Sequence, residues 1–463
     1  MADDSPGAPV PDAVRPRARP RRRLARAGGL AAVGAALVLG AAWSASPQGR
    51  VPLEGPGAPV PPPAAASTAA RAILDRVRPA MIQIKGFFGT NTAEAFRGSA
   101  FAVARGGVFV TNWHVVSEAV LYPEKYRLEY RTPAGAPGRV TVRAIDVRHD
   151  LALVEAQGFA PRPLSLRPGA AIKGERAYSV GFPLDVGLTI TEGVSNGRVE
   201  ESFEPRVHYS GALNPGMSGG PGLDGSGSVI GVNVAGYRAS QLVAFLVPTE
   251  HVAALLARAS GPPIDTGRAR AEVASQLRAH SEALLAALGS KLPTQNHQGY
   301  ELPAKPAPFV ECQAAGDPAP DRPVHVERIN CDAKSAVYLG RDLHTGGLTF
   351  QHQVLRTSTL DAWRFARRLQ EAKTPWGVFG PARQLAPFAC TQRDVALRGF
   401  TANATVCLRA YRKLDGIYDL NVRVVSKNRP TQGFVSSLSL TGVAADRALA
   451  FAGTYLEAMR WNP

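Results

Sequence analysis

Ser218 lies among glycines in the segment NPGMSGGP, residues 214–221. A serine hydroxyl is a weak nucleophile, and it needs a base to take its proton, an acid to orient that base, and hydrogen-bond donors for the oxyanion that forms. The neighbouring glycines would let the backbone N–H groups of Gly216 and Ser218 point toward such an oxyanion. The segment is therefore either an ordinary loop or a backbone bent to expose a nucleophile.

Two further segments carry side chains that could complete a catalytic site. His114 follows the apolar run of VFVTNWHVV, which places its imidazole at a strand end. Asp150 directly precedes the apolar strand of VRHDLALVEA, where a carboxylate can be partly buried and accept a hydrogen bond from an imidazole N–H. Asp146 is the local alternative, although it follows the preceding strand rather than opening the next. His114, Asp150 and Ser218 are therefore candidates for a catalytic triad, although no one of these segments decides the matter.

The surrounding elements predict a β-rich domain over residues 69–262. A helical opening is followed by short runs punctuated by glycine, among them MIQIKGFF, LALVEA and VIGVNVAG. Short strands at this spacing are typical of an antiparallel sandwich or barrel. The pattern ends at the helical segment TEHVAALLARA and the breaker SGPPIDTG, residues 260–267.

Taken together, these segments resemble the trypsin-like serine peptidases, and within them the high-temperature-requirement or Deg group. The resemblance covers about residues 80–258 and includes the segments GSAFAVARGGVFVTNWHVV, HDLALVEA, GFPLDVGLTITEGVSNGRV and NPGMSGGP. His, Asp and Ser follow one another in the chymotrypsin order. The resemblance implies an all-β, chymotrypsin-like fold of two six-stranded barrels with the triad between them. It also implies that His114 is the general base, Asp150 its orienting acid and Ser218 the nucleophile, with Gly216 and Ser218 as oxyanion donors.

The sequence departs from that group at two places. Met217 stands where a polar residue is usual before the serine, so we expect an altered rim of the site. The C-terminal part lacks the glycine-led carboxylate-binding loop of a PDZ domain. Peptide-tail sensing and trimeric assembly are therefore not implied, and the oligomeric state stays open.

The resemblance also suggests the substrate pocket. Ala212, six residues before Ser218, would form the floor of the pocket for the residue preceding the cut, called P1. Without a carboxylate there, a buried Lys or Arg would lose its ion pair and its hydration. Val232 and Val234 are expected in the pocket wall and would narrow it, so we predict a small or aliphatic P1 residue. The alternative is that Ala212 packs in the core and another residue forms the floor.

The N-terminal residues predict a membrane anchor. Residues 1–26 contain an arginine cluster and are expected in the cytoplasm, and residues 27–45 are uncharged over the length of a membrane span. This indicates a single-pass protein of the inner (cytoplasmic) membrane with its catalytic domain in the periplasm or outside the cell. A cleaved signal peptide that releases a secreted protein is the alternative. Residues 46–68 are a Pro/Ala-rich linker.

Residues 268–463 predict an α+β domain of unknown role. Its strands include LTFQHQVL and IYDLNVRVVS, and helices are expected at about 359–373 and 444–460. All four cysteines lie in this part: Cys312, Cys331, Cys390 and Cys407. Beyond a membrane an even number suggests disulfides, with nearest-neighbour pairing of Cys312 with Cys331 and Cys390 with Cys407 as one of three connectivities. Buried free thiols are the alternative.

Composition narrows the class of function. The chain has 463 residues and a net charge of +16, but it shows no basic patch interleaved with aromatics and no nucleic-acid-binding motif. No metal or organic cofactor is implied. We therefore expect a membrane-anchored serine endopeptidase that acts on extracytoplasmic protein or peptide substrates. The alternative is a catalytically inactive protease-fold scaffold or binding protein.

Overall fold

The computed structural model describes residues 68–184, 186–236, 242–259, 261–316, 321–372 and 380–462. The predicted cytoplasmic segment 1–26 and membrane span 27–45 lie outside these residues, as does all but the last residue of the linker 46–68. Within the described ranges, no helix combines the length and apolar character needed to cross a bilayer. Residues Pro63–Pro463 form one compact unit.

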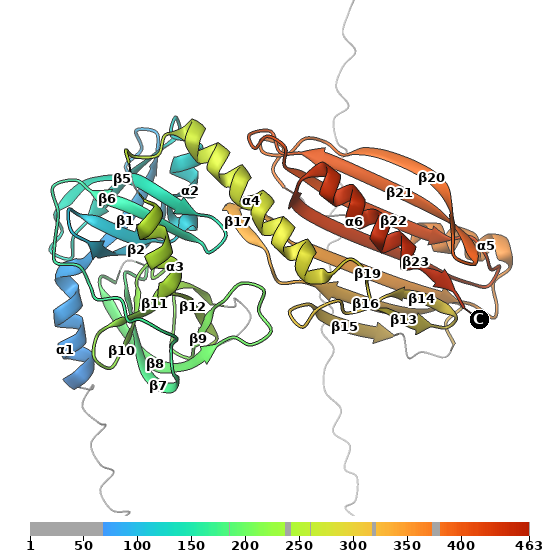
Figure 1. The fold of residues 1–463 in the computed structure, drawn as a ribbon, viewed down its shortest axis with the longest axis horizontal. Coiled ribbons are helices and arrows are strands. Elements are labelled where there is room, and N and C mark those ends of the chain that lie inside the picture. The colour runs from blue at the N-terminus through green and yellow to red at the C-terminus, as the bar shows by residue number, and fades with distance from the viewer. Residues whose placement is uncertain are drawn as a thin grey trace, which may run out of the picture. The chain divides into compact units, whose positions relative to one another are not determined.

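Two closed antiparallel barrels follow helix α1 (Thr68–Val77) (Figure 1). The first has the strand order β1-β2-β3-β6-β5-β4 and closes where β1 pairs with β4. Its elements are β1 (Met81–Phe88), β2 (Glu94–Ala104), β3 (Val108–Thr111), α2 (Trp113–Leu121), β4 (Tyr126–Arg131), β5 (Pro137–Asp146) and β6 (Leu151–Ala156).

The second barrel has the order β10-β11-β12-β9-β8-β7. Its elements are β7 (Lys173–Gly181), β8 (Thr189–Arg198), β9 (Val207–Tyr209), β10 (Pro221–Asp224), β11 (Val229–Gly236), β12 (Ala244–Pro248) and the following helix α3 (Thr249–Arg258). The prediction of two six-stranded barrels is confirmed. Closure leaves no strand edge unpaired and encloses the apolar side chains of each barrel.

A long helix, α4 (Thr266–Leu288), leads from the barrels into the C-terminal part (Figure 1). Asp265 caps its N-terminus by accepting a hydrogen bond from Arg268 N at 2.9 Å. Ala269, Val273 and Leu277 of α4 are buried in the same cluster as residues of the first barrel, so the helix packs directly on that barrel.

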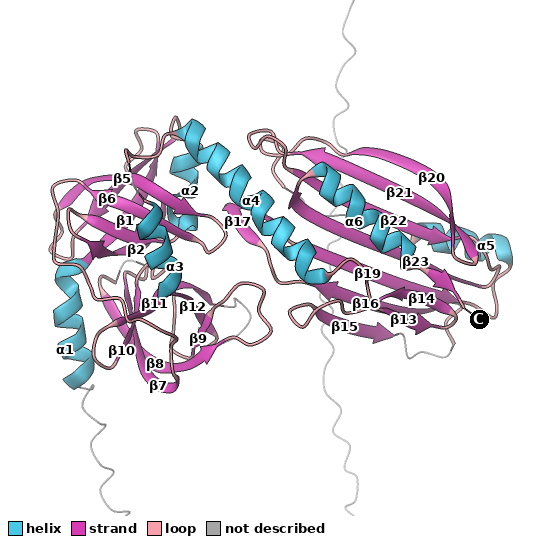
Figure 2. Cartoon of the chain, viewed as in Figure 1, coloured by secondary structure: helices cyan, strands magenta, loops and turns pink. Residues whose placement is uncertain are grey.

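The C-terminal part is α+β, as predicted, and centres on a seven-stranded antiparallel sheet of order β15-β16-β19-β23-β22-β21-β20 (Figure 2). Its strands are β15 (Glu311–Gly316), β16 (His325–Asp332), β19 (Leu348–Arg356), β20 (Ala389–Leu397), β21 (Phe400–Ala410), β22 (Tyr418–Ser426) and β23 (Gln432–Val443). Around it lie the small strands β13 (Thr294–His297), β14 (Tyr300–Pro303), β17 (Val337–Gly340), β18 (Leu343–Thr345) and β24 (Arg460–Trp461), and helices α5 (Ala362–Glu371) and α6 (Ala445–Glu457).

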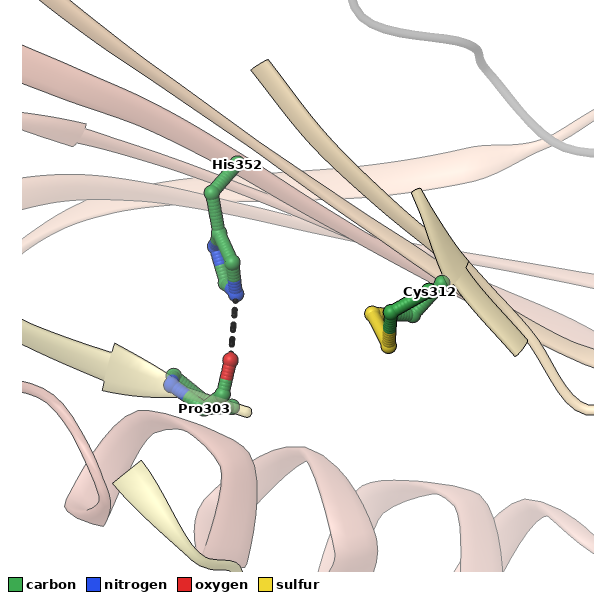
Figure 3. Close-up of a disulfide and its surroundings, with 4 residues drawn as sticks. Pro303, Cys312 and His352 are labelled. Atoms are coloured by element: carbon green, nitrogen blue, oxygen red, sulfur yellow. Dashed lines mark hydrogen bonds between the residues drawn. A yellow bond between two sulfur atoms is a disulfide. The ribbon is translucent and has the colours of Figure 1, made fainter. Parts of the chain in front are cut away.

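Helix α6 packs on the sheet through Phe451 and Tyr455, which are buried with strand residues such as Phe350 and Phe434. His352 of β19 is fully buried beside this core, and burial lowers the pKa of its imidazole to about 4. Its neutral ring lies 2.9 Å from the Pro303 carbonyl, toward which it points in Figure 3.

Both predicted disulfides are confirmed. Cys312–Cys331 joins β15 to β16, and Cys390–Cys407 joins β20 to β21 (Figure 3 shows the first). The bonds therefore link the outermost pair of strands at each end of the seven-stranded sheet. All four cysteines are thus paired, and none is free.

Candidate active site

The first barrel brings His114 and Asp150 together. His114 is the second residue of α2, directly after β3, and Asp150 immediately precedes β6, the neighbour of β3 in the barrel. Asp150 Oδ2 lies 2.7 Å from His114 Nδ1, and Oδ1 accepts the His114 backbone N–H at 2.8 Å. Because a carboxylate only accepts, Nδ1 carries the proton and Nε2 is left with its lone pair. The imidazole is thus oriented with a basic nitrogen available.

The backbone of Asp150 is held in a left-handed conformation with φ of 60°. Asn112 supports it by donating from Nδ2 to the Asp150 carbonyl at 2.8 Å. The competing acid, Asp146, is engaged elsewhere: it pairs with His149 at 3.0 Å and with Arg258 at 2.8 Å. The geometry therefore favours Asp150 over Asp146 as the partner of His114.

Ser218 comes from the turn between β9 and β10 of the second barrel. Its hydroxyl donates to the Val234 carbonyl at 2.9 Å, so in this state it points to β11. His114, Asp150 and Ser218 nevertheless line one cleft. Catalytic hydrogen bonds are often absent before substrate binds, and rotation about one side-chain bond redirects the hydroxyl.

The two predicted oxyanion donors have no hydrogen-bond acceptor among the described residues. Leu184 N donates to the Pro215 carbonyl at 3.1 Å. Since C=O and N–H point in opposite directions across a trans peptide, the Gly216 N–H is turned away from Leu184. Among the hydrogen bonds of the described residues, neither the Gly216 nor the Ser218 N–H has an acceptor. Gly216 adopts φ of 99°, and a Cβ there would lie 2.4 Å from the Phe182 carbonyl oxygen, so only glycine fits.

Ser99 of β2, which sequence reasoning missed, ties this loop to the first barrel. It is fully buried. Its hydroxyl donates to the Gly216 carbonyl at 2.7 Å and accepts from Phe182 N at 2.9 Å, and its N–H donates to the Ser218 carbonyl at 2.7 Å. Its only sequence signal was its place in the GSAF segment.

The cleft has a volume of about 1040 Å³ and includes the predicted pocket residues Ala212 and Val234. Ala212 is exposed, so it does not pack in the core. Val232 is not at the cleft, because it is fully buried in the core between the barrels. A β-bulge between Asn233 and Ala235 changes the course of β11 just beyond it. Met217 is also fully buried, so the expectation that it alters the rim is wrong.

A charge cluster surrounds the buried Glu204, and two of its members, Arg148 and His149, directly precede Asp150 in the chain. Glu204, in the loop between β8 and β9, pairs with Arg148 at 2.6 Å, with His149 at 3.4 Å and with His280 of α4 at 3.2 Å. Burial opposes its charge, but these hydrogen bonds hold the pKa of Glu204 far below its usual range. Burial likewise disfavours charged His149, but Asp146 and Glu204 raise the pKa of its imidazole overall.

Residues of the C-terminal part also line the cleft and a second cavity beside it. Ala336, Tyr338, Arg341 and His344 line the same cleft, and no sequence signal pointed to them. A second cavity of about 590 Å³ shares Arg148, Arg206 and Ala336 with it. Among the described residues, no group of three His, Cys, Asp or Glu side chains could hold a metal ion.

Comparison with known proteins agrees with this geometry. The family model described as trypsin-like peptidase domain matches residues 98–232. This part of the chain is a trypsin-like peptidase domain. The match contains His114, Asp150 and Ser218, and it ends within β11.

The peptidase domain has relatives of the HtrA and DegP type. Human serine protease HTRA3 is 26% identical over 199 residues, which are 40% of this chain and 43% of HTRA3. The Chlamydia pneumoniae protein named "Probable periplasmic serine endoprotease DegP-like" is 34% identical over 148 residues, which are 31% of this chain and 29% of that protein. The chain thus spans less than half the length of these relatives. The crystal structure of Rv3671c protease from M. tuberculosis in its active form aligns with a TM-score of 0.38 and 20% identity, over 42% of this chain and 87% of that one.

Proposed function

We propose that the protein is a serine endopeptidase that cleaves peptide bonds through Ser218, His114 and Asp150. The observation that carries the proposal is the oriented imidazole, with Asp150 Oδ2 2.7 Å from Nδ1, in one cleft with Ser218. Among the described residues the N–H groups of Gly216 and Ser218 have no acceptor, which leaves them available to an oxyanion. Nucleophile, base, orienting acid and oxyanion donors are the four parts that acyl transfer requires. The trypsin-like peptidase domain and its serine protease relatives support the same reaction class.

In the proposed first step Ser218 turns from the Val234 carbonyl toward His114 Nε2, which takes its proton as Oγ bonds to the substrate carbonyl carbon. The oxyanion accepts hydrogen bonds from the Gly216 and Ser218 N–H groups. His114 then gives the proton to the leaving nitrogen, the C–N bond breaks, and an acyl-enzyme remains. Water, deprotonated by His114, then attacks the ester carbonyl. The bond between the acyl carbon and Ser218 Oγ breaks, and His114 returns the proton to Oγ as the carboxylic acid product is released.

The pocket supports a small or aliphatic P1 residue. The cleft is lined by the small or apolar residues Ala212, Leu213, Val234, Leu242 and Val243. Among its described lining residues the one carboxylate belongs to Asp150, which is paired with His114. A Lys or Arg side chain entering this region would find no free counter-ion among the described residues that line the cleft. We propose preference for Val, Ala or Leu, and cleavage profiles dominated by Arg or Lys would contradict it.

We also propose that the protein acts outside the cytoplasm and is anchored by residues 27–45. The two disulfides support an oxidising location, and the basic residues before 27 support the orientation. A reporter fused to the C-terminus and active only in the cytoplasm would contradict this topology. Release of a soluble form beginning near residue 45 would instead indicate a cleaved signal peptide.

The deciding experiment is labelling of the purified full chain with a fluorophosphonate, which reacts with activated serines. We expect one label on Ser218, with none on Ser218→Ala and very little on His114→Ala. Hydrolysis of a protein substrate should fall by about 10⁴-fold or more in both variants. Ser226→Ala, an exposed serine on the β10–β11 turn, is the matched control and should behave as wild type. Proteolysis unchanged in Ser218→Ala would overturn the assignment.

A further inference from the structure

The hairpin of β17 and β18 lies against the helix that carries His114. Trp113, the first residue of α2, donates from Nε1 to the Tyr338 carbonyl at 2.9 Å. Further along α2, Glu118 Oε1 accepts from Arg341 N at 3.2 Å. Arg341 also reaches the first barrel, where Nη2 donates to the Ala95 carbonyl at 2.6 Å. The hairpin is therefore attached to the peptidase domain both within β17 and at its turn.

The hairpin is a fixed element and not a lid. Val337, Leu339 and Leu343 are buried in the same apolar cluster as Trp113 and other residues of α2 and the first barrel. Lifting the hairpin would expose these side chains to water and break the hydrogen bonds to Trp113 and Glu118. Its cleft-facing side chains are therefore permanent walls.

Strand alternation sets which side chains face the cleft. Val337 and Leu339 are buried in the apolar cluster, so Tyr338, between them, falls on the opposite face of β17 and lines the cleft. The Tyr338 ring meets the His114 ring edge to face, with centroids 5.6 Å apart, and His344 braces it from β18 at 5.4 Å. Burial, together with the negative charges of Glu118 and Asp150, raises the pKa of Tyr338 to about 12. The phenol is thus a neutral wall.

One end of the hairpin lies on the side of the cleft that holds the proposed P1 pocket. The Arg341 end of the hairpin contacts Ala95 at the start of β2, whereas Ala336 lines the second cavity with Phe245 of β12. The residues just before Phe245, Val243 and Ala244, line the cleft beside the proposed P1 pocket. Tyr338 lies between these ends, next to His114 and close enough to feel the charge of Asp150.

We propose that Tyr338 is a specificity-determining residue that restricts the substrate side chain immediately before P1 to Gly, Ala or Ser. This inference rests on the proposed peptidase function. When the substrate carbonyl carbon lies on Ser218 Oγ and the leaving nitrogen faces His114 Nε2, the preceding residue lies one residue length, about 3.3–3.6 Å, further along the chain. There it meets the space over the imidazole that Tyr338 bounds, and two rings in direct contact leave no gap for a larger side chain.

The test compares cleavage of a peptide library by full-length wild type, Tyr338→Ala and Tyr338→Phe. Asp342→Ala, an exposed residue on the turn of the same hairpin, is the matched control. We expect wild type, Tyr338→Phe and Asp342→Ala to require a small residue before P1. In Tyr338→Ala, kcat/KM for peptides with Leu at that position, relative to Ala, should rise at least about 10-fold. If Tyr338→Ala folds poorly, Tyr338→Val serves as a second variant that also removes the ring. Both variants keep the backbone carbonyl that accepts the hydrogen bond from Trp113.

Fluorophosphonate labelling separates the two ideas. Equal labelling of all variants with an unchanged preference before P1 in Tyr338→Ala and Tyr338→Val would overturn the role of Tyr338 and leave the peptidase function intact. A wild type that is neither labelled nor cleaves peptides would overturn both. A loss of the preference in Tyr338→Phe as well would show that the hydroxyl, and not the ring as a wall, sets it.

Discussion

Asp150 contributes its backbone as well as its carboxylate to the proposed site. A left-handed φ of 60° is unfavourable for most residues, but aspartate tolerates it better than β-branched or bulky ones. The conformation lets both carboxylate oxygens reach His114, one to the ring and one to the backbone N–H. The strain, of order 1–3 kcal/mol, is offset by the surrounding hydrogen bonds, which is common at functional sites.

Ser99 is predicted to be a positioning residue for the nucleophile loop. Ser99→Ala leaves the buried Gly216 carbonyl and Phe182 N–H without their hydroxyl partner, at a cost of about 1–3 kcal/mol. Because the loop carries the oxyanion donors, we expect the rate of fluorophosphonate labelling to fall by about 10-fold or more. Ser195→Ala, another fully buried serine but on β8, is the control and should keep its labelling rate. If Ser99→Ala and Ser195→Ala lowered the melting temperature equally and neither changed the labelling rate, Ser99 would have only a structural role and not a positioning role.

Among individual residues, the sequence predicted those whose type and neighbouring residues indicate a catalytic role. His114, Asp150 and Ser218 could be named because glycines, a strand end and an apolar run marked them. Ser99 could not, since a serine within an apolar strand has no distinguishing signal until the loop packs against it. Tyr338 could not either, because more than two hundred residues separate it from His114 in the chain and only tertiary packing joins them.

Among the elements, long apolar strands were predictable and short or polar ones were not. The run LALVEA coincides with β6, and all but the first residue of IYDLNVRVVS forms β22. Strands β9 and β18, of three residues each, carry too little pattern to be read from sequence. The bulge in β11 was invisible for another reason: it depends on pairing with β12, which the local sequence does not encode. This is why Val232 was expected at the pocket and is instead in the core.

The charge cluster couples three elements and predicts a pH dependence of stability. Glu204 has a folded-state pKa below its ordinary 4.5, so its contribution is complete above that pH and is lost as the pH falls. His149 has a folded-state pKa above its ordinary 6.5, so its contribution is complete below that pH and is lost as the pH rises through the raised value. The contributions of Glu204 and His149 are therefore both complete between about pH 4.5 and 6.5. Buried His352, whose folded-state pKa of about 4 lies below its ordinary 6.5, destabilises the fold as the pH falls through that range. We therefore expect the melting temperature to be highest near pH 6.5.

Glu204→Gln tests whether Glu204 causes this pH dependence. The amide carries no charge and therefore forms no ion pair with Arg148 or His149. Melting curves from pH 3 to 9 should show a lower and flatter profile for Glu204→Gln than for wild type. Glu282→Gln, an exposed glutamate on α4, should follow the wild-type profile. A wild-type profile retained by Glu204→Gln would mean that other groups set the pH dependence.

For the molecule as a whole, the peptidase domain and the C-terminal part share one apolar core. Trp113, Val116 and Val120 of α2 are buried together with Leu277 of α4 and Leu339 of β17. The sequence predicted a helix and strands after residue 268 but not the elements against which they pack. The pattern of apolar residues along a helix is the same whether the helix packs on a sheet of its own domain or on a neighbouring barrel. The breaker at residues 260–267 therefore separates two segments of sequence that pack as one compact unit.

This shared core predicts that the peptidase domain depends on the C-terminal part for stability. A chain ending at residue 262 loses the cover of α2, and each large apolar side chain returned to water costs about 1.5–3 kcal/mol, against a total stability of only about 5–15 kcal/mol. We expect this truncated chain to aggregate or to melt well below the full chain. Within the full chain, Leu339→Ala should lower the free energy of unfolding by about 2–5 kcal/mol. Leu449→Ala, at a leucine of α6 that is 46% exposed, should change it by less than about 0.5 kcal/mol. Truncated protein that melts cooperatively at the temperature of the full chain would show instead that the barrels are stable without the C-terminal part.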